Sequence, residues 1–122
     1  MGPKTSKLVD TLADIVALLR ADNEQHWSRY VDDCRNRMLA PDYSGVEKLL
    51  SSYGGMGSFN DVVIGYSESD KGWKANAKKL NENLNLLRTQ AYELAQDIQR
   101  NHAIGSTNKP LKNDARKNAR TS

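Results

Sequence analysis

The most distinctive run in the sequence is Gly54-Gly55-Met56-Gly57-Ser58, in which three of the first four residues are glycines. Glycine readily adopts left-handed backbone conformations, and successive amides in such conformations can form a concave anion-binding site. A P-loop is excluded because no Lys-Ser or Lys-Thr pair follows Gly57. Two interpretations stay open: a helix stop and chain reversal that buries Met56 and Phe59, or a surface that contacts a partner.

Asn60 and Asp61 follow this run and carry side-chain oxygens that can accept hydrogen bonds. Such residues in turns often bond to their own backbone, which is one interpretation, and a contact with a partner is the other. A general base would need a partner acid or a metal, and the nearby sequence contains no clear candidate for either. A small enzyme or ligand-binding domain that uses residues 54–61 is therefore only a further alternative.

The remaining reactive side chains do not form a recognisable catalytic or metal-binding site. His26 and His102 match no metal-binding spacing, so we predict no metal site and no cofactor. Cys34 is the single cysteine, which excludes an internal disulfide, and it falls on an apolar helical stripe as a buried packing thiol would. We predict that the protein is not an enzyme.

The elements that position these residues are predicted from apolar residues at helical spacing. Helices are expected over residues 7–21, from Asp22 to a stop at Pro41, from Ser44 to about Tyr53, and over about 73–101. The helix starts are assigned to capping side chains, which are Thr5 or Ser6, Asp22 with Gln25, and Ser44 with Glu47.

The second helix should bury Trp27, Tyr30 or Val31, Cys34 and Met38. Residues 62–64 are β-branched and fit a strand, an extended segment or a helical turn. In the last helix, Trp73, Ala77, Leu80, Leu84, Leu87, Ala91, Leu94 and Ile98 recur by fours and threes. That repeat can pack against other helices or pair two copies of the chain in a homodimer.

We therefore predict a mainly α fold: a compact four-helix bundle over residues 5–101 with a glycine-rich loop and a short extended segment. Residues 102–122 are expected to form a disordered basic tail. No apolar run is long enough for a membrane span, and no signal peptide precedes the first helix, so we expect a cytoplasmic protein without membrane contact.

The charge is unevenly distributed along the 122 residues, which carry a net charge of +3. The basic excess lies in the tail, in Lys109, Lys112, Arg116, Lys117 and Arg120. Such a tail either solubilises the chain or neutralises nucleic-acid phosphates without reading sequence. Residues 22–47 carry six acidic side chains against three arginines, which favours a basic protein partner.

Two stretches resemble a family of small bacterial helical proteins of unknown function. They are Leu18-Leu19-Arg20-Ala21-Asp22 followed by Trp27, and the segment from Tyr53 to Ile64 with its GGMGSFND core. The resemblance covers about residues 8–98 and implies a short helical domain. It implies no established activity for the signature residues Gly54 to Asp61.

These observations favour a non-catalytic protein-binding module of the immunity or antitoxin kind, which docks an acidic face and the glycine-rich loop on a partner protein. The predicted contact residues are Asp22, Glu24, Asp32, Asp33, Tyr43, Gly54, Gly55, Met56, Gly57, Ser58, Asn60 and Asp61. Tyr43 and Tyr66 are the aromatic residues best placed for an interface. The alternative is a nucleic-acid-associated accessory protein that makes weak contacts through the basic tail.

Overall fold

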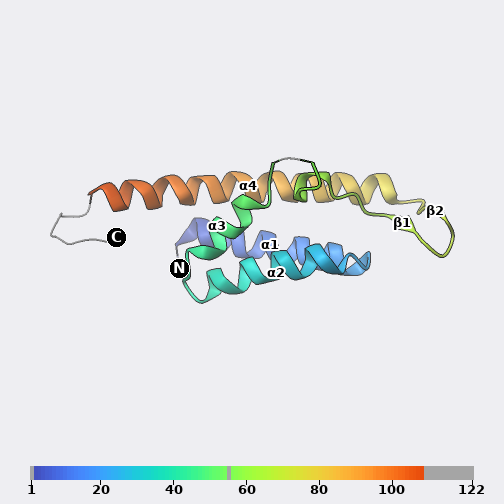
Figure 1. Ribbon diagram of the computed structural model, residues 1–122, viewed down its shortest axis with the longest axis horizontal. Helices are drawn as coiled ribbons and strands as arrows, with labels where there is room; N and C mark the ends of the chain where they lie inside the picture. The colour runs from blue at the N-terminus through green and yellow to red at the C-terminus, as the bar shows by residue number, and fades with distance from the viewer. Residues whose placement is uncertain (1, 55, 109–122) are drawn as a thin grey trace.

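The computed structural model describes residues 2–54 and 56–108, which form a mainly helical fold, as predicted (Figure 1). In these residues we find four α-helices, one short 3-10 helix and a two-stranded sheet. The elements are α1 (Pro3–Ala21), α2 (Gln25–Leu39), α3 (Ser44–Ser51), η1 (Phe59–Asp61), β1 (Tyr66–Ser67), β2 (Gly72–Trp73) and α4 (Ala77–Asn108).

The helices pack as a small bundle beneath the long helix α4. Figure 1 shows α1 and α2 side by side, with α4 running along the other side of α1 and α3 bridging α2 and α4. The buried core draws on every helix and on the segment after α3. Its largest fully buried side chains are Phe59, Leu8, Leu12, Ile15, Leu19, Leu49, Ile64, Leu84, Val31 and Cys34.

The starts of the first two helices differ from the prediction. Helix α1 begins at Pro3 with Gly2 as its N-cap, because proline lacks the amide hydrogen that a first helical residue leaves unpaired. Helix α2 is capped by Glu24, whose carboxylate accepts the Trp27 amide at 3.0 Å. Asp22, expected to open α2, instead lies at the C-terminal cap of α1.

The third helix starts at Ser44 as predicted and ends at Ser51, two residues before the predicted end, without the predicted capping pair. Its N-cap is Tyr43, which makes no side-chain cap bond. The carboxylate of Asp42 accepts the Ser44 amide at 2.9 Å, so the acceptor comes from two residues earlier in the chain. Val46 and Leu49 are buried, as the apolar spacing predicts.

The last helix is shifted relative to the predicted range of about 73–101. Trp73 belongs to β2, where it pairs with Tyr66 in antiparallel register, and it therefore does not start the helical stripe. Helix α4 continues through Gly105 to Asn108, since one glycine in a helix costs only about 1 kcal/mol. The predicted domain boundary after residue 101 thus falls inside α4, and residues 109–122 of the predicted tail lie outside the described residues.

The β-branched segment of residues 62–64 is extended without belonging to a strand. The side-chain amide of Asn81 on α4 bonds to both backbone groups of Ile64. It accepts the Ile64 amide hydrogen at 2.8 Å and donates to the Ile64 carbonyl at 2.7 Å. One side chain thereby replaces the neighbouring strand that an extended segment otherwise needs.

Candidate functional site

Two of the predicted acidic contact residues on α2, Asp32 and Asp33, are paired within the chain. Asp33 accepts from Lys48 Nζ at 2.7 Å and from Arg37 Nε at 2.9 Å. These cations, Lys48 above all, hold the pKa of Asp33 below its usual value. Asp32 pairs with Arg20 at 3.3 Å. This part of the predicted acidic face is therefore largely neutralised by neighbouring side chains.

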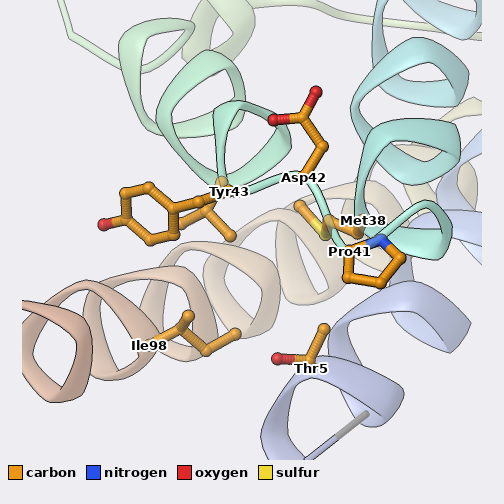
Figure 2. Close-up of a pocket in the computed structure, with 7 residues that line it drawn as sticks. Thr5, Met38, Pro41, Asp42, Tyr43 and Ile98 are labelled. Carbon is orange, nitrogen blue, oxygen red and sulfur yellow. The ribbon is translucent and has the colours of Figure 1, made fainter. Parts of the chain in front are cut away.

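Tyr43 borders an apolar pocket of about 230 Å³ between the start of α1, the α2–α3 turn and α4 (Figure 2). Its ring stacks on His102, with the ring centroids 3.9 Å apart and the planes 11° from parallel. The lining residues are Thr5, Met38, Pro41, Asp42, Tyr43, Val46 and Ile98. In Figure 2 the Asp42 carboxylate points away from Thr5 and Ile98. The pocket therefore presents mainly apolar surface to a ligand.

The glycine-rich loop is closed by its own carboxylate. Asp61 Oδ2 accepts the Gly57 amide at 2.7 Å, which matches the interpretation of an acidic turn residue that bonds to its own backbone. Phe59 is fully buried, as the chain-reversal interpretation predicts, whereas Met56 is fully exposed, and its predicted burial is wrong. The bend carries Met56 on its outer side, while the Phe59 amide is tied to the Ser52 carbonyl at 2.8 Å.

The other residues of this loop contribute little chemistry in the described part of the chain. Asn60 and Asp61 are exposed, and Gly54 turns the chain with a φ of 114°. The Ser58 hydroxyl is buried without a hydrogen-bond partner among the described residues. Gly55 lies outside those residues. Because the Gly57 amide is already satisfied, the loop does not present it to an anion.

Arg88 on α4 is a buried structural side chain that the sequence pattern did not single out. It is only 7% exposed, and its Nη1 donates to the Phe59 carbonyl at 2.6 Å and to the Val62 carbonyl at 2.9 Å. Desolvation by burial lowers the pKa of its guanidinium. Arg88 lies four residues after Leu84 and three before Ala91, so it falls on the apolar stripe of the helix. A charged residue on that stripe is the sequence signal that could have identified it. Arg88 clamps the end of the glycine-rich loop to α4.

Asp22, the first predicted contact residue, joins α1 to the segment that precedes α4. Its Oδ2 accepts the Gly65 amide at 3.0 Å and its Oδ1 accepts from Lys74 Nζ at 2.9 Å. The Lys74 amide in turn donates to the Gly65 carbonyl at 2.7 Å. These bonds fix both ends of the β1–β2 hairpin to the helical core.

The β1–β2 hairpin lies at the end of the molecule where α1 meets α2 (Figure 1). It exposes an aromatic pair, Tyr66 and Trp73. Trp73 is 62% exposed and Tyr66 is 42% exposed, and the two rings meet edge to face with centroids 5.3 Å apart. Val63 beside them is also exposed. Tyr66 is exposed, and its predicted interface role stays a prediction. The spacing of Trp73 continues the apolar stripe and predicts a place in the helical core, which its exposure contradicts.

A polar groove of about 490 Å³ separates this hairpin from the α1–α2 turn. Its lining brings the predicted contact residues Asp22 and Glu24 together with the hairpin. The full set is Asp22, Asn23, Glu24, Val63, Tyr66, Ser67, Glu68, Ser69 and Lys74. We call the hairpin face the surface formed by Val63, Tyr66, Trp73, Asp22, Glu24 and Glu68. Asp32, Asp33, Tyr43 and the glycine-rich loop do not line this groove.

Two further features bear on the kind of site. Within the described residues, no group of three or more His, Cys, Asp or Glu side chains is arranged to hold a metal ion. Among the helices described above, none is long and apolar enough to cross a membrane. The basic residues of the nucleic-acid alternative, Lys109, Lys112, Arg116, Lys117 and Arg120, lie beyond Asn108, so that alternative stays a prediction.

Comparison with known proteins gives a match to a family model. The model of a domain of unknown function, DUF6966, matches residues 20–72. The matched stretch begins at the end of α1 and includes α2, α3, the glycine-rich loop and most of the hairpin. The expected similarity to an uncharacterised domain family is thereby confirmed. No curated protein and no solved structure matches the chain.

Proposed function

We propose that this protein is a non-catalytic protein-binding module whose main contact surface is the hairpin face. The observation that carries the proposal is the exposed, edge-to-face pair of Tyr66 and Trp73. Tryptophan and tyrosine are enriched among the residues that dominate binding energy at protein interfaces. A tryptophan with most of its surface exposed is available for such a contact.

The anchoring of the hairpin supports this role. Asp22 and Lys74 hold both ends of the hairpin, and Asn81 fixes the preceding residue Ile64 to α4. A contact surface that is already ordered loses less conformational freedom on binding, which improves affinity. The hairpin that carries the aromatic pair is therefore already ordered before a partner binds.

The charge of the surface favours a basic partner. Asp22, Glu24 and Glu68 line the groove with one cation, Lys74. Complementary charge mainly accelerates association and selects against wrong partners. This suits a bacterial, cytoplasmic protein of the immunity or antitoxin kind, which captures a basic toxin or effector. The fully exposed Met56 makes the tip of the glycine-rich loop a second contact.

The proposal is tested by affinity capture from a lysate of the native host, followed by mass spectrometry. Wild type is compared with Trp73→Ala and with Leu86→Ala, which removes an equally exposed apolar side chain from α4. The expected result is a protein retained by wild type and Leu86→Ala and lost with Trp73→Ala. Equal recovery of the same proteins with all three baits would contradict the proposal.

A further inference from the structure

We infer that the groove beside Tyr66 receives the side chain of an arginine or lysine from a basic segment of the partner protein. The inference rests on the proposed function, because it names the chemistry that the hairpin face recognises. It starts from the shape of the surface. The groove runs between the α1–α2 turn and the hairpin, and its volume of about 490 Å³ exceeds that of the apolar pocket near Tyr43.

The ion pairs on the groove walls leave negative charge uncompensated. Lys74 is the single cation among the lining residues, and its ammonium group is committed to Asp22 at 2.9 Å. Asp22 is in turn nearly buried, with 10% of its side chain exposed, and it also holds the Gly65 amide. Asp22 and Lys74 therefore neutralise each other, and their ion pair holds the hairpin in place.

Glu24 and Glu68 remain as the carboxylates open to a ligand. Neither belongs to an ion pair in the described part of the chain, although Glu24 Oε2 accepts the Trp27 amide. Two carboxylates in one groove with no cation of their own favour a positively charged occupant and repel a phosphate. The groove thus selects a basic peptide over a nucleic acid.

The aromatic side chains complete the recognition of a cation. Tyr66 lines the groove, and Trp73, which is not among the lining residues, packs edge to face against its ring. A guanidinium or ammonium group over an aromatic face is attracted by the ring electrons, and arginine is the more frequent partner. The aliphatic stem of the same side chain can pack on the exposed Val63.

The experiment uses a capped peptide of alternating glycine and arginine, and a matched peptide with neutral citrulline in place of arginine. Both are titrated into the isotopically labelled full chain and followed by amide NMR. The test variant is Glu24→Gln with Glu68→Gln, in which the side-chain amide oxygen introduced at position 24 can still cap α2. The control variant is Asp10→Asn with Asp14→Asn, which removes two exposed carboxylates from α1.

The arginine peptide is expected to shift the amides of residues 22–24 and 63–74 in the wild type. The test variant should weaken its binding by about two- to five-fold for each carboxylate removed, as exposed ion pairs do. The control variant should bind like wild type. Equal binding of the citrulline peptide, equal weakening by the control variant, or shifts confined to other residues would each overturn the inference.

The outcome is separable from that of the proposed function. If the test variant captures the native partner as well as wild type does, while Trp73→Ala loses it, the hairpin face binds a partner without a basic anchor. In that case the inference fails and the proposed function stands. If Trp73→Ala retains the partner, the proposed function itself fails.

Discussion

The carboxylate of Asp22 accepts from the ammonium group of Lys74 at 2.9 Å, across 52 positions of the sequence. The same carboxylate holds the Gly65 amide at 3.0 Å, so one side chain at the end of α1 ties down both ends of the hairpin. The exposed aromatic pair lies between these two attachments. Asp22 therefore contributes to the proposed contact surface chiefly by positioning the hairpin.

Replacing Asp22 with alanine leaves the buried Gly65 amide without its acceptor. We expect the free energy of unfolding to fall by about 1–3 kcal/mol, the cost of a buried polar group left unpaired. Denaturant unfolding measures the loss. The control is Asp32→Ala, whose exposed pair with Arg20 should contribute less than about 1 kcal/mol. Equal losses in the two variants would show that Asp22 does not anchor the hairpin.

Two glycines with positive φ allow a matched comparison. Gly65 has a φ of 95°, and a methyl group there would lie 2.7 Å from the Ala77 Cβ. Gly57 has a φ of 79° with open space around it. Gly57→Ala should cost about 1–2 kcal/mol of unfolding free energy from backbone strain alone. Gly65→Ala should cost at least about 1 kcal/mol more because of the clash. A smaller loss for Gly65→Ala in thermal or denaturant unfolding would contradict this close packing.

The Arg88→Met variant tests the clamp on the glycine-rich loop. Methionine preserves much of the apolar stem but leaves the Val62 carbonyl without its donor. The Phe59 carbonyl keeps only the longer bond from the Val62 amide at 3.3 Å. We expect the free energy of unfolding to fall by about 2 kcal/mol or more. Amide exchange should accelerate in residues 57–64. Arg29→Met, which removes an exposed guanidinium bonded to Gln25, is the control and should leave both measurements unchanged.

Cys34 provides a test of the core by titration. Burial raises the pKa of its thiol to about 11. An exposed thiol in the unfolded chain titrates near about 8.5. Between these pH values the unfolded chain loses the thiol proton that the folded chain keeps, so the free energy of unfolding falls as pH rises. Ultraviolet thiolate absorbance of native and urea-unfolded protein measures both values, and a native value near that of the unfolded chain would contradict the burial.

The helical core was predictable because its signal is local. Val31, Cys34 and Met38 recur at helical spacing and are buried, and the stripe of α4 packs on the core through Leu84 and Ala91. The end of α2 at Leu39, two residues before Pro41, was equally predictable, since proline lacks the amide hydrogen that a helix requires. Spacing alone assigns such residues without knowledge of the rest of the fold.

The hairpin face was only partly predictable, because its contacts are remote in sequence. Trp73 continues the apolar stripe into Ala77, and only its pairing with Tyr66 reveals a strand. The helix-capping pattern at Asp22 is local, whereas its real partners, Gly65 and Lys74, lie 43 and 52 positions away. The acidic residues of α2 also suggest a free surface, although Asp33 pairs with Arg37 one turn along the same helix and with Lys48. Only the Lys48 pair needs α3 beside α2.

The measurement that tests the central claim most directly is the dissociation constant of the captured partner for wild type and for Trp73→Ala, by isothermal titration calorimetry. Circular dichroism first verifies that the variant is folded, as expected for a side chain that is 62% exposed. The account predicts that binding weakens by about 30-fold or more, the effect of removing a residue that dominates an interface. An unchanged dissociation constant would contradict the hairpin face as the contact surface.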